Sequence, residues 1–174
     1  MYLWFRGHRG NKCCPLVNAQ SILPSAFYMC CLLGPAVIDG HQREDGTVEY
    51  LSTDDLRRCL HARTKLVEAN VAIAFRMFAG HVSIGCKDIK TCERALRESR
   101  RALRTSYRAV ASYHVLQSWK HWIADQDAEV EFCDRCETML FARDVEERRN
   151  IWKTLPSIMG LHNWKAIMDE SGVD

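Results

Sequence analysis

Four of the nine cysteines have a spacing that suits metal coordination. Cys133 and Cys136 form a Cys-x-x-Cys pair, and Cys86 and Cys92 form a wider Cys-x5-Cys pair earlier in the chain. Zn²⁺ takes four thiolate sulfurs in tetrahedral geometry at about 2.3 Å, and a Cys-x-x-Cys pair supplies two of them from one turn of chain. Gly85 lets the backbone bend before Cys86. The spacing therefore predicts a structural zinc site on these four residues.

Two other interpretations of these cysteines stay open. Five residues separate Cys86 from Cys92, which is wider than the usual two to four, so all four thiols can also be ordinary core and loop residues. Cys133 and Cys136 can alternatively form a redox pair, although the βαβ pattern of thioredoxin-like proteins is missing. His81, five residues before Cys86, is the reserve metal ligand among scattered histidines.

The other cysteines predict packing and compartment rather than chemistry. Cys30, Cys31 and Cys59 lie in apolar helical runs and are expected in the core, while Cys13 and Cys14 receive no role. An odd count with two adjacent doublets suits a disulfide framework poorly. We therefore expect an intracellular protein, cytoplasmic or nuclear, with no membrane association.

A basic stripe is the second candidate feature. Five arginines recur every three or four residues and are expected on one helix face that attracts phosphate or an acidic partner: Arg94, Arg97, Arg101, Arg104 and Arg108. The overall charge is only +2. The charge of +5 on residues 87–108 is cancelled by the charge of −5 on residues 125–149. Two bland interpretations stay open: the acidic segment faces the stripe within the fold, or the stripe is a solvated face. Nucleic-acid binding is therefore the alternative function and not the first one.

The chain shows no sign of catalysis. It contains no G-x-S-x-G, no phosphate-binding glycine loop and no paired carboxylates in a context for acid–base work. The 174 residues, 47% of them hydrophobic, are enough for one folded domain. We expect a protein that is not an enzyme.

Helical periodicity runs through nearly the whole chain and predicts an all-α fold, an irregular bundle of about six helices. Residues 1–21 are expected to form a poorly ordered arm, and residues 22–170 are expected to form one helical domain. Ser52 and Asp55 form a capping box before a long helix, and Pro24 suits a first helical turn. Further helices are expected at 91–107, 115–127, 134–154 (ended by Pro156) and 163–169. Six large residues are expected in the core, with a partner-facing groove as the alternative: Trp119, Trp122, Trp152, Leu155, Leu161 and Trp164.

Three segments carry a resemblance to a known family. They are Leu-Pro-Ser-Ala-Phe-Tyr-x-Cys-Cys from residue 23, Arg-Glu-Asp-Gly-Thr-Val-Glu-x-Leu-Ser-x-x-Asp-Leu-Arg-Arg-Cys-Leu from residue 43, and Glu-Glu-Arg-Arg-x-Ile-Trp-x-x-Leu-Pro-x-x-x-Gly-Leu from residue 146. In this order, over residues 22–164, they resemble fungal BTB/POZ domain-containing proteins, in particular the expanded set of mushroom-forming fungi.

The resemblance implies a helical region that follows the BTB domain and carries a Cys…Cys and a later Cys-x-x-Cys, which favours zinc at Cys86, Cys92, Cys133 and Cys136. The BTB domain itself, a small sheet covered by helices, would precede Ile22, where this chain has 21 residues. Either the chain is truncated or the helical half functions alone, so dimerisation and ubiquitin-ligase adaptor roles are not carried over. We expect a noncatalytic protein-interaction module with a structural zinc and an unidentified protein partner.

Overall fold

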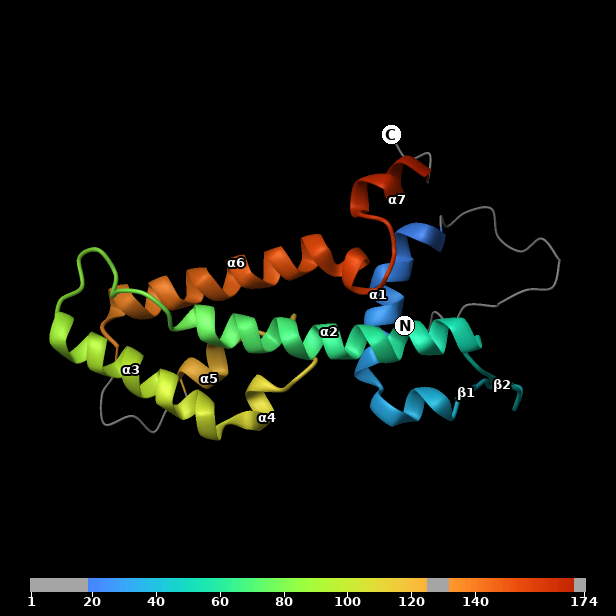
Figure 1. Ribbon diagram of the computed structural model, residues 1–174, viewed down its shortest axis with the longest axis horizontal. Helices are drawn as coiled ribbons and strands as arrows, with labels where there is room; N and C mark the ends of the chain where they lie inside the picture. The colour runs from blue at the N-terminus through green and yellow to red at the C-terminus, as the bar shows by residue number, and fades with distance from the viewer. Residues whose placement is uncertain (1–18, 125–131, 171–174) are drawn as a thin grey trace. The chain divides into compact units, whose positions relative to one another are not determined.

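The computed structural model describes residues 19–124 and 132–170 and confirms the all-α fold (Figure 1). The described residues form seven α-helices, one 3₁₀ helix and a two-stranded sheet. In chain order the elements are α1 (Ala19–Leu32), η1 (Gly34–Ile38), β1 (His41–Gln42), β2 (Val48–Glu49), α2 (Thr53–Met77), α3 (Ile89–Thr105), α4 (Tyr107–Val110), α5 (Lys120–Ala124), α6 (Asp134–Ile158) and α7 (Trp164–Glu170). Most of the predicted arm, residues 1–18 with Cys13 and Cys14, lies outside the described residues.

The contacts of the chain divide it into two compact units, where the sequence predicts a single helical domain. Unit 1 combines residues up to 65 with those from 153 onward, and unit 2 spans residues 66–152. The two boundaries fall inside α2 and α6. Each unit has its own buried residues, so each is described by itself.

Unit 1 buries apolar residues from α1, the first part of α2 and the end of α6. The side chains of Cys31, Cys59, Leu155 and Met159 are fully buried, and Phe27 is nearly so. The predicted core position of Cys31 and Cys59 is therefore confirmed, with the Cys31 thiol 3.5 Å from the Cys59 carbonyl oxygen.

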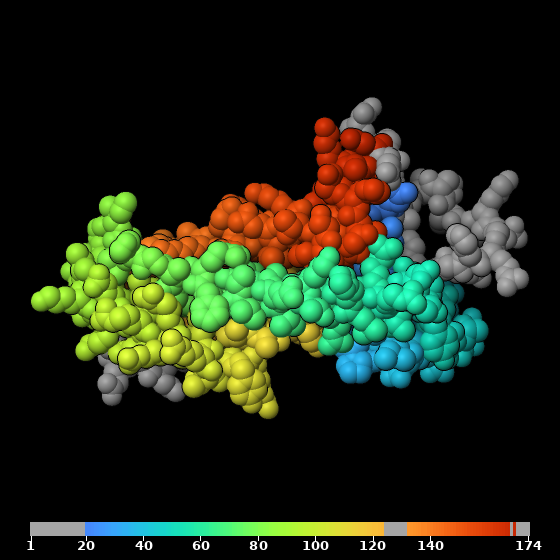
Figure 2. All heavy atoms as spheres, viewed as in Figure 1, coloured from blue at the N-terminus to red at the C-terminus, as the bar shows by residue number. Residues whose placement is uncertain are grey.

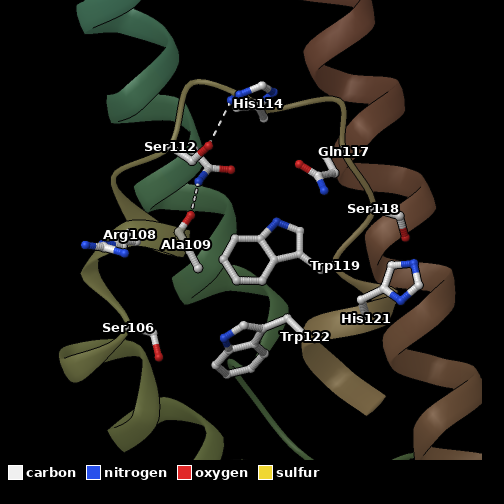
Figure 3. Close-up of a pocket in the computed structure, with 11 residues that line it drawn as sticks. Ser106, Arg108, Ala109, Ser112, His114, Gln117, Ser118, Trp119, His121 and Trp122 are labelled. Atoms are coloured by element: carbon white, nitrogen blue, oxygen red, sulfur yellow. Dashed lines mark hydrogen bonds between the residues drawn. The ribbon is translucent and has the colours of Figure 1, made fainter. Parts of the chain in front are cut away.

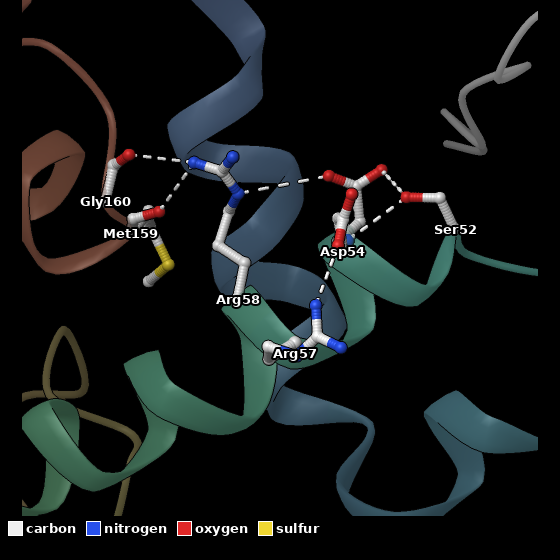
Figure 4. Close-up of polar contacts among 7 residues, drawn as sticks. Ser52, Asp54, Arg57, Arg58, Met159 and Gly160 are labelled. Atoms are coloured by element: carbon white, nitrogen blue, oxygen red, sulfur yellow. Dashed lines mark hydrogen bonds and ion pairs between the residues drawn. The ribbon is translucent and has the colours of Figure 1, made fainter.

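Arg58 of α2 joins three segments of unit 1 (Figure 4). Its guanidinium Nη1 donates to the Gly160 carbonyl at 2.8 Å and more weakly to that of Met159 at 3.4 Å, and it lies over the Phe27 ring. Its Nε lies 3.9 Å from the Asp55 carboxylate. These contacts link α1, α2 and the turn after α6, and no sequence motif indicates them.

The predicted start of α2 is confirmed. The Asp55 backbone N–H donates to the Ser52 hydroxyl oxygen at 3.1 Å, and that hydroxyl donates to the Asp55 carboxylate at 2.8 Å (Figure 4). Ser52 thus satisfies one of the N–H groups that a helix start leaves without an intrahelical acceptor.

Both helical prolines differ from their predicted positions. α1 already begins at Ala19, so Pro24 lies inside the helix and not in its first turn. α6 continues to Ile158, so Pro156 does not end it near residue 154. A proline inside a helix removes one backbone hydrogen bond. Both rings are fully buried, and that apolar burial offsets the lost bond.

A short sheet and a shorter helix complete the local description. Val48–Glu49 pairs antiparallel with His41–Gln42 across a turn at Gly46, whose φ is +80°. The helix expected at 115–127 is confined, among the described residues, to Lys120–Ala124. It begins late because Asp144 of α6 accepts the Trp119 backbone N–H at 3.0 Å and the Ser118 hydroxyl at 2.7 Å.

Unit 2 is built from the remainder of α2, α3 to α5 and most of α6. Its fully buried side chains include Leu66, Phe78, Leu96 and Leu140, one or more from each of the three long helices. Arg76 of α2 forms a two-bond ion pair with Glu147 of α6, at 2.7 and 2.8 Å. The two helices are therefore neighbours within unit 2.

Candidate metal centre

The four predicted ligands come together in unit 2. The Sγ atoms of Cys86, Cys92, Cys133 and Cys136 all lie within 4.8 Å of one another. The Cys86 and Cys133 sulfurs are 3.7 Å apart. Four sulfurs at about 2.3 Å from one tetrahedral ion are about 3.8 Å from each other. The cluster is therefore close enough to hold a metal ion, at or slightly wider than the ideal spacing.

Two helix starts supply three of the ligands. Cys92 lies in the first turns of α3, whose N-cap Asp88 accepts the Thr91 N–H at 3.1 Å. Cys133 caps α6, since its carbonyl accepts the backbone N–H of Cys136 at 2.8 Å. Helix N-termini carry partial positive charge, which favours the thiolate of Cys133 at the start of α6.

The fourth ligand, Cys86, lies on the loop between α2 and α3. Arg143 of α6 fixes the start of this loop by donating to the carbonyls of Met77 at 3.0 Å and Ala79 at 2.9 Å. At the other end Gly85 has a φ of +88°, and the Cys86 N–H closes a turn onto the Ser83 carbonyl at 3.0 Å. The predicted bend at Gly85 is thus present, and it aims Cys86 at the cluster.

Backbone N–H groups point at the sulfurs. The Ser83 N–H donates to Cys136 Sγ and the Cys133 N–H to Cys92 Sγ, each at 3.4 Å. The N–H groups of Lys87 and Cys136 are directed at Cys133. Such outer hydrogen bonds orient the ligands of metal sites and hold negative charge on them.

Without a metal, the thiols differ strongly in acidity. The N–H groups of Lys87 and Cys136 lower the pKa of Cys133 to about 6. Loss of hydration on burial raises the pKa of Cys92 to about 12 and also raises the pKa of Cys136. One thiol that ionises readily beside two that resist ionisation is a poor arrangement for free cysteines. A divalent cation removes the conflict, because coordination deprotonates thiols outright.

The donor set itself is selective. All four ligand atoms are sulfur, and no histidine or carboxylate joins the described cluster. His81, the reserve ligand, is exposed and is not part of it. Four sulfurs with no open position fit a closed structural zinc site and not a catalytic one, which keeps one position for water. The residues present therefore fit zinc.

The predicted arginine stripe is divided between two helices. Arg94, Arg97, Arg101 and Arg104 lie on α3 and are exposed; we call these four the arginine face. Arg108 is also exposed, but α3 ends at Thr105 and Arg108 belongs to α4. The α3–α4 segment forms part of the molecular surface seen in Figure 2, in yellow-green.

Among the described residues, the acidic segment of residues 125–149 forms no ion pairs with the arginine face. Glu147 pairs with Arg76, Asp134 with Lys87, and Asp144 with Arg148, at 2.7, 3.0 and 2.9 Å. None of the arginines on the face forms an ion pair with a described residue. The acidic residues at 125, 127, 129 and 131 lie outside the described residues.

The expected core aromatic and aliphatic residues are only partly buried. Trp119 and Leu155 are buried as predicted, and Trp122, Leu161 and Trp164 are half-buried. Trp152 is 45% exposed, although it lies within the same helix as Leu155. The two residues are three positions apart, so their side chains point about 60° apart around the helix axis.

Comparisons with known proteins do not add a family to these observations. No family model, no curated protein and no solved structure matches the chain. Among the described residues no helix combines the length and apolarity needed to cross a membrane.

Proposed function

We propose that the chain is a noncatalytic protein-interaction module held together by a structural zinc ion on Cys86, Cys92, Cys133 and Cys136. The observation that carries the proposal is the convergence of four sulfurs from one loop and two helix starts on one small volume. Isolated thiols have no reason to meet in this way, whereas a tetrahedral ion requires it. The redox alternative explains Cys133 and Cys136 but gives no role to Cys92.

Zinc supplies enough free energy to decide whether this end of unit 2 folds. Apparent binding free energies of structural zinc sites are about 10–16 kcal/mol, comparable with the whole stability of a domain, about 5–15 kcal/mol. The loop between α2 and α3 has no hydrophobic core of its own, since none of residues 79–91 is buried. The metal thus replaces a hydrophobic core in this loop.

The loop that the metal holds offers an apolar contact surface. Ile84 is fully exposed, with a relative accessibility of 101%, and Ile89 is 55% exposed. Both flank Cys86 in sequence. An exposed isoleucine on a metal-fixed loop loses little conformational entropy on binding, which favours association with a protein partner. The resemblance to the helical half of fungal BTB proteins agrees with this role and stays a prediction.

Metal analysis of the protein purified without added zinc tests the proposal. We expect about one zinc per chain, and we expect Cys92→Ala to lose it because three thiolates leave the ion an open position. Cys59→Ala is the matched control, since it also removes a fully buried thiol but one outside the cluster.

A second measurement keeps the test decisive if Cys92→Ala does not fold. Cobalt(II) added to the metal-free native chain should give the intense visible absorption and thiolate charge-transfer bands of a tetrahedral all-sulfur site. Absence of bound metal in the native protein, together with no such bands, would show that the four cysteines are ordinary thiols.

The exposed arginine face supports a second candidate, binding of nucleic acid. Its four exposed guanidinium groups form no ion pair with a described residue, so they can meet phosphates. We expect Arg97→Glu with Arg101→Glu to weaken binding of a labelled oligonucleotide and to lower the salt slope by about 1 per lost phosphate contact. Arg57→Glu, an exposed arginine of unit 1, is the control. Binding that is insensitive to salt would contradict this candidate.

A further inference from the structure

The pocket of unit 2 is set among packed side chains and contains no thiol. It has a volume of about 570 Å³ and lies between α2, α4 and the chain leading through α5 (Figure 3). Trp119 in its lining is only 7% exposed, and the rings of Trp122 and Phe78 are 4.9 Å apart, so these indoles pack within unit 2. The four thiols of unit 2 all lie instead at the candidate metal centre.

The four sulfurs of this centre differ in their access to solvent. Cys92 and Cys136 are 1% and 0% exposed, whereas Cys86 and Cys133 are half-buried. The two buried sulfurs also accept backbone N–H groups, Cys92 from Cys133 and Cys136 from Ser83, each at 3.4 Å. An oxidant dissolved in water therefore meets Cys86 and Cys133 first, because oxidation of cysteine follows exposure.

Cys86 and Cys133 also lie close enough to react with each other. Their sulfurs are 3.7 Å apart, so they must approach by about 1.7 Å to reach the length of about 2.0 Å of a disulfide bond. None of residues 79–91 is buried, so this loop can follow the Cys86 side chain without opening a core. Cys136 is fixed in the first turn of α6, and turning its sulfur toward Cys133 would break the bond from Ser83.

We propose that Cys86 and Cys133 form a peroxide-sensitive pair whose disulfide releases the metal from the centre. The proposal rests on the structural zinc of the proposed function, because it concerns the regulation of that same site. The pair differs from a Cys-x-x-Cys redox pair, since it joins the loop before α3 to the start of α6 and leaves Cys136 reduced.

The oxidant is hydrogen peroxide, and the reaction has two steps. The Cys133 thiolate attacks one peroxide oxygen, which forms an S–O bond, breaks the O–O bond and expels hydroxide. The Cys86 thiolate then attacks the Cys133 sulfur, which forms the S–S bond, breaks the S–O bond and expels a second hydroxide. Two thiolates thus lose two electrons, and the peroxide becomes two hydroxide ions that take up protons from the solvent. The remaining thiolates, those of Cys92 and Cys136, are too few to hold a tetrahedral ion.

The disulfide holds less of the backbone than the metal does. The four thiolates tie the loop to the starts of both α3 and α6, whereas the disulfide ties the loop only to α6. Oxidation therefore releases Cys92 and the start of α3. Ile89, the first residue of α3, then loses its fixed position relative to Ile84, so the apolar surface offered to a partner changes.

Peptide mapping of the zinc-loaded chain after treatment with hydrogen peroxide tests the pairing. Free thiols are blocked with N-ethylmaleimide, and the protein is cut with trypsin without reduction. Trypsin cuts after lysine and arginine, which places the four cysteines in four different peptides: 77–87, 91–94, 121–135 and 136–143. We expect mass spectrometry to find 77–87 linked to 121–135 as the main product, with about one zinc released per disulfide.

Two variants locate the pair independently of the metal. Cys92→Ala and Cys136→Ala each remove a buried ligand, and both should still form the Cys86–Cys133 link, because both partners are present. Cys59 is the internal control, since it is fully buried outside the cluster and should remain a thiol. If either variant does not fold, the map of the native chain decides the matter.

Hydrogen exchange measures the structural effect of oxidation. Amides in the first turn of α3 should exchange faster after peroxide treatment, because Cys92 no longer holds that turn. Unchanged exchange there would contradict the release of α3. Reduction with dithiothreitol followed by added zinc should restore the slow exchange.

Three results would overturn the proposal. They are a main link between 121–135 and 136–143, zinc release without any disulfide, and oxidation of Cys59 to the same extent as Cys133. Zinc content measured before peroxide is added separates these failures from that of the metal centre. An untreated chain without zinc contradicts the proposed function, whereas a zinc-loaded chain that forms no Cys86–Cys133 link contradicts only this inference.

Discussion

Asn70 shows how a single buried polar residue organises unit 2. It is 2% exposed, and its side-chain amide donates to the carbonyls of Ala109 at 2.8 Å and Val110 at 2.9 Å. These carbonyls belong to the end of α4, where helical carbonyls lack intrahelical partners. Asn70 therefore serves as a cap supplied by another helix.

Asn70→Ala should lower the free energy of unfolding by about 1–3 kcal/mol, because it leaves buried carbonyls without donors. Urea denaturation followed by circular dichroism measures this. Thr64→Ala, an exposed site on the same helix, should change stability by no more than about 0.5 kcal/mol. Equal effects of the two substitutions would mean that the Asn70 bonds contribute nothing.

Among the cysteines that the structure describes, Cys133 should be the most reactive in the metal-free protein. Its pKa is lowered to about 6, so its thiolate fraction rises from pH 5 to 7, where an ordinary cysteine with a pKa of about 8.5 is still protonated. Pulse alkylation with iodoacetamide and mass spectrometry should show half-maximal labelling of Cys133 near pH 6. Zinc should abolish the labelling.

Cys30 is the internal reference for this experiment. It is half-buried and lies outside the cluster, and a hydrogen bond with Cys59, followed by burial, raises its pKa. Its labelling should stay low across the same pH range. A Cys133 profile centred at or above pH 8.5 would show that the backbone N–H groups do not stabilise its thiolate.

At the scale of the element, the cap of α2 depends on residues only three positions apart in the chain. Ser52→Ala removes the acceptor of the Asp55 N–H and should cost about 1 kcal/mol, within the 0.5–2 kcal/mol known for such caps. Thermal or urea unfolding measures the change. Thr53→Ala is the control, since Thr53 is exposed and has no side-chain bond to a described residue. A cost that is equal for both variants would contradict the capping role.

The N-terminal starts of α3 and α6 are held together by contacts between them. Cys92 accepts the Cys133 N–H, and Lys87 before α3 pairs with Asp134 in the first turn of α6 at 3.0 Å. That ion pair is exposed on both sides and contributes little by itself. The sulfur cluster is the only strong connection between these two helix starts in the described chain.

At the scale of the whole molecule, removal of the metal should act locally before it acts globally. Chelation should raise amide hydrogen exchange in residues 83–92 and 133–138, where the backbone is held by bonds to sulfur. The amides around the cap of α2 in unit 1 should keep their protection, because Ser52 and Asp55 hold them without the metal. Hydrogen exchange followed by mass spectrometry measures both. Unchanged exchange near the cysteines would contradict a structural metal.

Several features follow from the sequence by itself. Helical periodicity predicts the all-α class, Ser52 and Asp55 predict the start of α2, and the two cysteine pairs predict the cluster. These signals are local or depend on residue type alone: a cap needs a hydroxyl three residues before an N–H, and four thiols of suitable spacing are rare.

Only the tertiary structure decided the rest. The end of α3 before Arg108, the late start of α5 and the buried helical prolines depend on what packs against each segment. The bonds of Arg143 to Met77 and Ala79, and those of Arg58 to Gly160, join residues far apart in the chain. A sequence pattern reports which residues share a face, whereas the partner of that face is set by long-range packing. For that reason the cluster of four cysteines could be predicted from its spacing, and the Arg143 bonds that fix the loop of Cys86 could not.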